Sequence, residues 1–408
     1  MIVTRHYLTI NGRRIHYRRA GKGPSLLMLH QSPRSSAEYE QLMAEWGRDF
    51  TCIAPDTPGF GRSDPLPKPD PNIDDYADAV VDFARALGLS RTAAYGFHSG
   101  GIILVTALKR HPELFSGLAV GGYAIWTPAE MAIFGERYLP PFEPSLYGEH
   151  LPWLWHRIME QSWFFPWFDL RAETRLPGAH DDPARVHAVV MEMLDAGDAY
   201  RLGYGAVLRA PRDIPPPGSV TPPVLISAYD GDPLQTHIDR LGAMPAGWIA
   251  QKVATAAEHQ AISLAFLRDH AGPAVEAFAE DDDAGFVPLE CNGFSGLIHW
   301  RGAGSRLAAH APGGEAALTD VQDSIVIDLP GHGLSSGWQA AAPTGRRAWM
   351  EVANVAARHF GAGSADAAST PHRRAGAALP RPDPRSPRRV SVYRLEHCRA
   401  RQFFRTLV

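Results

Sequence analysis

One stretch of ten residues decides the fold: Thr92-Ala93-Ala94-Tyr95-Gly96-Phe97-His98-Ser99-Gly100-Gly101. Its beginning, residues 92–95, is typical of a short buried strand, and the apolar residues 102–108 that follow predict a helix that ends before Pro112. A tight glycine turn therefore joins a strand directly to a helix. The residue at the centre of such a turn adopts a strained backbone conformation. Its neighbours two before and two after must be small, because the strand and the helix pass close to them.

The glycine spacing places His98 at the centre of this turn. Gly96 and Gly100 are the two small neighbours if His98 is central, whereas a central Ser99 would put Phe97 in a tight position. In G-x-S-x-G sequences with the same strand–turn–helix context, the central residue is a nucleophilic serine. We therefore predict that His98 occupies a nucleophile position and keep Ser99 as the alternative nucleophile. The backbone N–H of Ser99 is expected to form half of an oxyanion hole.

Two further segments complete a resemblance to the α/β-hydrolase family of the AB hydrolase-1 type. Residues 27–33, LMLHQSP, resemble the family's oxyanion loop, and residues 54–63, APDTPGFGRS, resemble its D-x-P-G-x-G-x-S loop. The resemblance covers residues 5–275 and implies an α/β-hydrolase fold, a mostly parallel sheet with helices on both faces, over residues 1–280. Two departures stand out: His30-Gln31 replaces the commoner His-Gly, and His98 replaces the usual Ser, Cys or Asp. Gln31 is expected to give the second oxyanion N–H.

The resemblance also implies an acid and a histidine, in the chain order nucleophile, acid, histidine. A strand at 223–228 leads to Asp232, which precedes a proline as the family's acid usually does; Asp230 is the alternative. A last strand at 248–253 and a loop at 254–258 deliver His259 before a helix at 261–268. The Asp232 carboxylate is expected to pair with the His259 imidazole and to fix its tautomer. The predicted catalytic residues are thus His98, Asp232 and His259.

Residues 125–217 form an insertion that resembles the helical cap of many α/β hydrolases. It contains five of the ten tryptophans of the chain. Most of these rings are expected to pack cap helices on the core, but an apolar substrate pocket is expected among them. The residues expected at this pocket are His30, which we expect mainly to brace its loop, and Trp126, Trp163 and Trp167.

The C-terminal part of the sequence repeats the start. Residues 297–304, LIHWRGAG, echo 14–21, RIHYRRAG, and residues 327–335, IDLPGHGLS, echo the segment that ends at Ser63. Residues 281–361 are therefore expected to be a truncated second hydrolase-like copy that stops before a catalytic turn. Residues 362–408 contain ten arginines and four closely spaced prolines, which predicts a disordered basic tail without catalysis.

Composition excludes little and favours a small-molecule partner. A net charge of −4 gives no reason to expect nucleic acid or a membrane surface, and no apolar run is long enough for a transmembrane helix. Three scattered cysteines and the lack of a signal peptide favour a cytoplasmic location. No metal motif or phosphate-binding loop is present, so no cofactor is expected. The oligomeric state is not predicted.

These observations predict an enzyme that acts on an ester, a lactone or another carbonyl-containing small apolar substrate by histidine-assisted hydrolysis. At its position His98 could act as a general base, as a covalent nucleophile or not at all. The alternatives are a non-hydrolytic ligand-binding pseudoenzyme and a cofactor-free lyase or oxygenase on the same fold. Haloalkane dehalogenase chemistry is not expected, because the relatives that perform it place an aspartate at the central turn position.

Overall fold

The computed structural model describes residues 1–211, 213–275, 278, 283–291, 293–310 and 323–367. The chain divides into two compact units, Met1–Phe278 and Ala279–Val408. The predicted disordered tail, 362–408, starts too early, because Gly363–Ala367 form a strand that pairs in the second sheet; from position 368 onward the tail lies outside the described residues.

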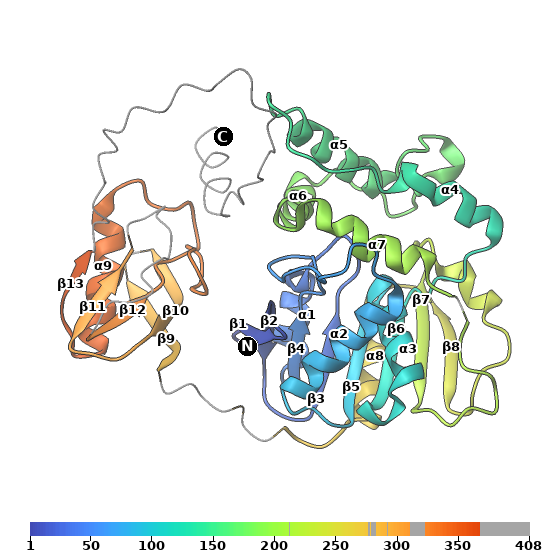
Figure 1. Cartoon of the computed structure of the whole chain (residues 1–408), viewed down its shortest axis with the longest axis horizontal. Helices are drawn as coiled ribbons and strands as arrows, with labels where there is room; N and C mark the ends of the chain where they lie inside the picture. Colours follow the sequence, from blue (N-terminus) through green and yellow to red (C-terminus); the bar gives the residue numbers. More distant parts are fainter. Residues whose placement is uncertain (212, 276–277, 279–282, 292, 311–322, 368–408) are drawn as a thin grey trace, which may run out of the picture. The chain divides into compact units, whose positions relative to one another are not determined.

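The first unit is built on an eight-stranded sheet with the order β1-β2-β4-β3-β5-β6-β7-β8 (Figure 1). Strand β2 runs antiparallel to β1 and β4, and all other neighbouring strands are parallel. This sheet confirms the predicted α/β-hydrolase fold. The strands are β1 (Thr4–Ile10), β2 (Arg13–Ala20), β3 (Ser25–Leu29), β4 (Thr51–Pro55), β5 (Thr92–Phe97), β6 (Phe115–Gly121), β7 (Val224–Tyr229) and β8 (Trp248–Val253).

Helices cover both faces of this sheet, and the alternation of side chains along β3 shows which helix meets which face. Leu26 and Met28 pack with α1 (Glu40–Trp46) and α8 (Ala256–Asp269). Leu27 and Leu29 point the other way, toward α2 (Ile73–Ala86) and α3 (Ser99–Arg110). Burial on both faces explains why the central strands are continuous apolar runs.

The turn from β5 to α3 has the geometry that its glycines require. His98 has φ +46° and ψ −111°, a backbone conformation that residues other than glycine rarely adopt. A Cβ atom on Gly96 would lie 2.7 Å from the carbonyl carbon of Gly100, and one on Gly100 would lie 2.0 Å from the backbone oxygen of Leu29. His98 is therefore the central residue of a strand-to-helix turn that only small neighbours permit.

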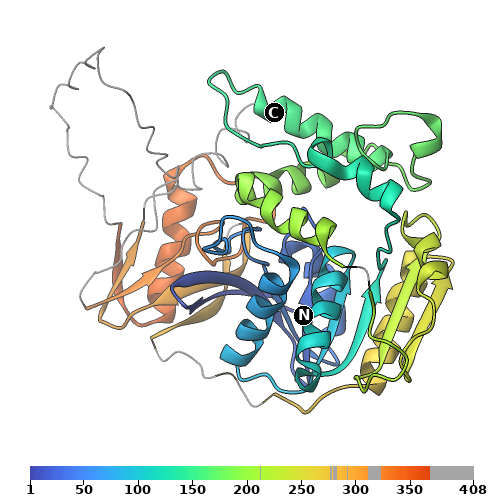
Figure 2. The same ribbon diagram turned by 45° about the vertical axis from the view of Figure 1, so that its right-hand side comes forward.

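Four helices between β6 and β7 cover the edge of the sheet where the parallel strands end, as Figures 1 and 2 show. They pack on one another and on Phe60 of the loop after β4. Arg34 donates to Glu192 of this insertion at 2.9 Å, which ties it to the loop after β3. The helices are α4 (Pro128–Tyr138), α5 (His150–Trp163), α6 (Pro183–Ala196) and α7 (Tyr200–Arg209). Short 3-10 helices lie at η1 (Ser36–Tyr39), η2 (Pro112–Leu114), η3 (Ala172–Thr174), η4 (Gly197–Ala199) and η5 (Gln235–Arg240).

The second unit contains a five-stranded sheet with the order β13-β11-β12-β10-β9. Its pairings have the same order and the same directions as β5-β3-β4-β2-β1 in the first unit. His299 Nδ1 lies 2.9 Å from Asp328, just as His16 Nδ1 lies 2.8 Å from Asp56. These features support the partial second copy, which stays a prediction. The elements are β9 (Ala284–Cys291), β10 (Phe294–Arg301), β11 (Arg306–Ala309), β12 (Ser324–Ile327), α9 (Arg346–His359) and β13 (Gly363–Ala367).

The packing at the turn gives a first prediction. Gly100→Ala should lower the free energy of unfolding by about 2 kcal/mol or more, because its methyl group would overlap the Leu29 carbonyl. Gly218→Ala, where a methyl group meets nothing within 4 Å, is the matched control and should stay close to wild type. Urea unfolding measures both. Equal stability of the two variants would contradict the close approach of α3 to β3.

Candidate active site

The structure brings His98 and Asp232 into direct contact. His98 Nε2 lies 3.1 Å from Oδ1 and 3.2 Å from Oδ2 of Asp232. The carboxylate stands on the turn after β7, where its Oδ1 also accepts from the backbone N–H of Leu234 at 2.8 Å. The Asp232 side chain is fully buried, whereas a quarter of the His98 side chain is exposed. One edge of the His98 ring thus contacts a buried carboxylate, and the rest of the ring is partly exposed.

The charge state of Asp232 decides the tautomer of His98. Burial tends to raise the pKa of the Asp232 carboxyl, but the charge and hydrogen bond of His98 outweigh burial and hold this pKa below its usual value. An ionised carboxylate has only acceptors, so the proton between the two groups belongs to Nε2 of His98. The Nδ1 atom of a neutral His98 ring is then an unprotonated base.

The absence of a side chain at Gly122 leaves space for the contact between His98 and Asp232. It follows β6 with φ +58° and donates its N–H to the Ser227 carbonyl at 2.9 Å. A Cβ atom at this position would lie 2.6 Å from His98 Nε2 and 2.7 Å from Asp232 Oδ2. Gly122 was not predicted as a site residue, because nothing in the sequence shows which glycine faces the turn from the neighbouring strand.

His259 is not where the sequence predicted it. The expected pairing of Asp232 with His259 is wrong, since Asp232 is bonded to His98 and the His259 ring lies between Ser227 Oγ at 2.8 Å and Tyr95 OH at 2.9 Å. The reason is local. Helix α8 begins at Ala256 and not at 261, because Thr255 caps it by accepting from the N–H of Glu258. His259 is therefore a buried residue in the first turns of a helix rather than the end of a loop.

The predicted oxyanion donors are only partly available. The backbone N–H of Gln31 donates to Glu38 Oε2 at 3.0 Å, and its side-chain amide donates to the other carboxylate oxygen at 2.5 Å. This corrects the expected role of Gln31, because its N–H already has an anionic acceptor. Ser99, in contrast, is the first residue of α3, and first-turn N–H groups have no partner within their own helix.

The two alternative residues, Ser99 and Asp230, are less well placed than His98 and Asp232. Ser99 Oγ accepts from the Ser32 N–H at 2.5 Å and donates to Ser32 Oγ at 3.0 Å, so it is held by a serine rather than by an imidazole. Asp230 is exposed at the end of β7. Ser32, whose hydroxyl proton can still be donated, is a site residue that the sequence analysis did not select.

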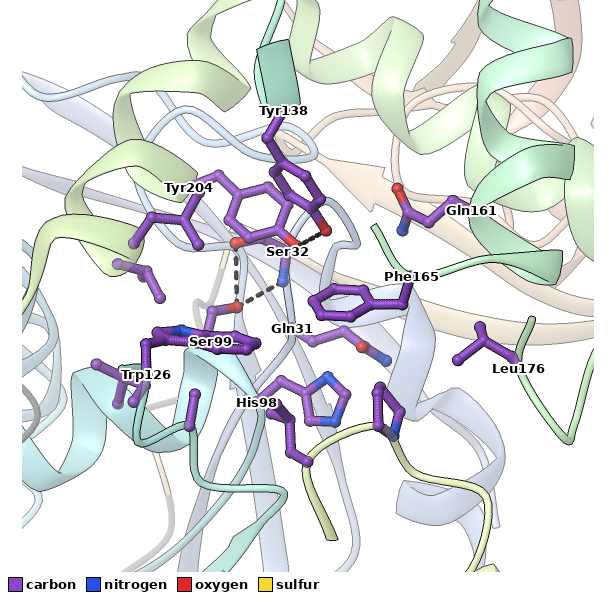
Figure 3. A pocket seen from close by; sticks show the side chains of 16 residues that line it. Gln31, Ser32, His98, Ser99, Trp126, Tyr138, Gln161, Phe165, Leu176 and Tyr204 are labelled. Carbon is purple, nitrogen blue, oxygen red and sulfur yellow. Dashed lines mark hydrogen bonds between the residues drawn. The ribbon is translucent and has the colours of Figure 1, made fainter. Parts of the chain in front are cut away.

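A cavity of about 210 Å³ opens over His98 and Ser99 (Figure 3). The insertion supplies its roof, where the hydroxyl groups of Tyr138 and Tyr204 lie 3.0 Å apart. Most of the wall is apolar, so a bound substrate would exchange water for side chains. The lining consists of Gln31, Ser32, His98, Ser99, Ile102, Ala124, Trp126, Tyr138, Gln161, Phe165, Leu176, Tyr204, Val207, Leu208, Pro233 and Leu234.

Of the four residues expected at the pocket, Trp126 lines this cavity. Trp163 donates its indole N–H to the His180 carbonyl, and Trp167 donates to the Tyr138 carbonyl, so both belong to the packing of the insertion. His30 is buried and accepts from the N–H of Thr57 at 3.0 Å, which agrees with a bracing role but places it outside the lining. The pocket assignments of Trp163, Trp167 and His30 are corrected accordingly.

In the part of the chain that the structure describes, no group of three or more His, Cys, Asp or Glu side chains could hold a metal ion. None of the helices in those ranges combines the length and the apolar character needed to cross a bilayer.

The fold and the turn geometry define the first unit as an α/β-hydrolase fold, and comparison with known proteins agrees. Residues 24–134 match the family model described as alpha/beta hydrolase fold. A solved structure of an epoxide hydrolase mutant from Vigna radiata has a TM-score of 0.50 and 13% identity, and covers 65% of this chain and 99% of its own. The first unit therefore has the α/β-hydrolase fold.

Curated relatives match over part of their length. Haloalkane dehalogenase 2 of Mycobacterium tuberculosis is 31% identical over 120 residues, which is 29% of this chain and 42% of the relative. A soluble epoxide hydrolase of Corynebacterium sp. strain C12 is 35% identical over 103 residues, which is 25% of this chain and 35% of the relative. The matches thus span less than half of the length of these relatives.

Burial of His259 gives a prediction for stability. Burial lowers its pKa from 6.5 to about 4, so between these values the unfolded chain binds more protons than the folded chain. The contribution of the neutral ring to the free energy of unfolding is fully present above pH 6.5. As the pH falls from 6.5 toward 4, the free energy of unfolding decreases by roughly 3 kcal/mol. Urea unfolding should therefore show a smaller decrease in the free energy of unfolding from pH 7 to pH 4.5 for His259→Gln than for wild type.

The exposed His156 supplies the control. His156→Gln makes the same side-chain change at an exposed position, and its pH dependence is measured beside that of His259→Gln. If His259→Gln shows the same pH dependence as wild type, His259 does not titrate on unfolding.

Proposed function

We propose that the first unit is a hydrolase for a small apolar ester, lactone or related carbonyl compound, in which His98 is a general base that activates water. The observation that carries the proposal is the contact of His98 Nε2 with the buried Asp232 at 3.1 Å. This contact leaves Nδ1, on a ring that lines the cavity, as the free base. None of the described residues forms a hydrogen bond to Nδ1.

The chemistry follows from that tautomer. His98 Nδ1 takes a proton from water as the oxygen attacks the substrate carbonyl, and the resulting imidazolium is stabilised by Asp232. The tetrahedral intermediate then collapses, and the same Nδ1–H returns its proton to the leaving alkoxide. Water and ester become acid and alcohol, and His98 ends as it began. No second imidazole is required, which agrees with the position of His259 between Ser227 and Tyr95.

The N-terminus of α3 can stabilise the negative charge that develops on the substrate carbonyl oxygen. Ser99 begins α3 and lines the cavity with His98, so its N–H and the positive end of the helix dipole are the donors expected there. The hydroxyl of Ser32 is a second donor within this wall. Because Glu38 occupies the N–H of Gln31, this oxyanion site has fewer backbone donors than the sequence motif predicted.

A base explains this arrangement better than a covalent nucleophile. The Asp232–His98 pair joins a carboxylate to an imidazole as in a catalytic triad, although through Nε2 rather than Nδ1, and the histidine itself lines the cavity. The name of one relative, a soluble epoxide hydrolase, supports hydrolytic chemistry. The name of another, haloalkane dehalogenase 2, is a weaker guide, because the central turn residue here is histidine.

Hydrolysis of a panel of aryl esters and lactones tests the proposal. His98→Ala and Asp232→Asn should each lower kcat/KM by about 100-fold or more, because each removes the oriented base. His259→Gln and Ser99→Ala should stay within about tenfold of wild type, since both His259 nitrogens are bonded to Ser227 and Tyr95 and the Ser99 N–H is retained.

The variants also separate the other mechanisms. Loss of activity in Ser99→Ala alone would identify Ser99 as the nucleophile. An acyl adduct on His98, seen by intact-protein mass spectrometry after rapid quenching, would identify covalent catalysis. Wild-type protein that hydrolyses no member of the panel, or that is unaffected by His98→Ala, contradicts the proposed hydrolase and favours a ligand-binding protein.

A further inference from the structure

Arg157 is a cation buried inside the helical insertion, on the face of α5 that is turned inward. The buried residues Leu154, Arg157 and Ile158, together with Gln161, follow the spacing of one helical stripe. Only 1% of Arg157 is exposed. Arginine remains charged at any physiological pH, and a buried charge is costly without a partner of opposite charge.

The structure gives this cation no such partner. Arg157 Nη1 donates to Gln161 Oε1 at 2.9 Å, but Nε and Nη2 have no hydrogen-bond acceptor, and among the described residues Arg157 forms no ion pair. The buried acid of the insertion, Glu192, is occupied by Arg34 at 2.9 Å and by the Ser35 N–H at 2.5 Å. Rings of Trp167 and Tyr200, with centroids 5.1 and 5.8 Å from the guanidinium carbon, offer only a partial substitute for an anion.

Gln161 connects this cation to the cavity over His98. Arginine has only donors, so the amide oxygen of Gln161 must face Arg157 and the amide NH2 group must face away from it. Gln161 lines the cavity over His98 and also a neighbouring cavity of about 270 Å³. Figure 3 shows its side chain in the wall beside Phe165 and Tyr138. The two N–H donors are thus presented to a ligand with a positive charge directly behind them.

The neighbouring cavity has a further arginine in its lining. It shares Gln31, Ser32 and Gln161 with the first cavity, and its lining includes Arg185 as well as Arg34, whose charge is paired with Glu192. A molecule that occupied both cavities would meet the apolar wall over His98 and, at Gln161, an amide backed by Arg157. Donors backed by a cation favour an ionised acceptor over a neutral one.

We infer that the Gln161–Arg157 pair is a carboxylate-binding subsite, and that the substrate is a small apolar carbonyl compound with a carboxylate group at a distance from the reacting carbonyl. Its carboxylate accepts from the Gln161 amide and supplies the anion that Arg157 lacks. The identity of this ligand as substrate rests on the proposed function, whereas its binding does not require turnover.

Gln161→Glu tests the subsite without removing the cation. The new carboxylate would pair with Arg157 inside the protein, so the variant should have a higher Tm than wild type and should lose the subsite. Gln251→Glu makes the same change of charge at an exposed position of β8 and is the control. The probes are acetate, butyrate, phenylacetate and 3-phenylpropionate, each with its matched primary amide, measured by isothermal titration calorimetry.

Wild type and Gln251→Glu should bind at least one carboxylate tenfold or more tightly than its amide. In Gln161→Glu, affinity for that carboxylate should fall at least tenfold, while affinity for the amide should change less than threefold. If no carboxylate binds more tightly than its amide, or if Gln161→Glu keeps the preference, the inference is overturned. A Tm of Gln161→Glu below that of the control also overturns it, because Arg157 would then have gained nothing.

The carboxylate subsite and the proposed hydrolase activity can fail independently of each other. Ester hydrolysis that depends on His98 without a carboxylate preference would leave the hydrolase standing and remove the subsite. A carboxylate preference lost in Gln161→Glu, in a protein that hydrolyses nothing, would keep the subsite and remove the hydrolase.

Discussion

The site depends on one backbone constraint, the φ of +46° at His98. The constraint arises because α3 passes so close to β3 that a methyl group on Gly100 would meet the Leu29 carbonyl. Held in this way, the His98 ring projects toward the turn after β7 and meets Asp232, and Gly122 leaves the space for the contact. The buried carboxylate then orients the imidazole so that its other nitrogen serves the cavity. Packing at a turn thus determines which atom can act as a base.

Much of the fold was predictable, because each signal was local. The Asn11-Gly12 turn joins β1 to β2 with positive φ at both residues, the conformation that this residue pair favours. Continuous apolar runs predicted the buried strands, and the glycine spacing alone placed His98 at the centre of the turn. Boundaries were less accurate: α3 spans Ser99–Arg110 where residues 102–108 were expected, because the glycines after the turn already belong to the helix.

The site was predictable only in part, because its contacts are between distant segments. Chain order and the following proline selected Asp232, but they suggested His259 as its partner. The cap that Thr255 provides for α8 moves His259 into the helix, and Thr255-Ala256-Ala257-Glu258 carried that signal in the sequence. Other contacts have no local signature, such as the bond of Glu38 to Gln31 and the arrangement of Tyr138 and Tyr204 over the cavity. Arg157 was detectable only as a charge on the apolar stripe of α5.

The protonation of His98 is the most direct test of the account. In protein with 15N-labelled histidine, NMR distinguishes protonated from unprotonated ring nitrogens. Near neutral pH we expect the His98 proton on Nε2, and Asp232→Asn should disturb this preference because an amide can donate to the ring. The His259 signals should be little changed, since that ring is bonded to Ser227 and Tyr95. A neutral His98 with its proton on Nδ1, or one whose nitrogen signals are identical in Asp232→Asn, would contradict the account.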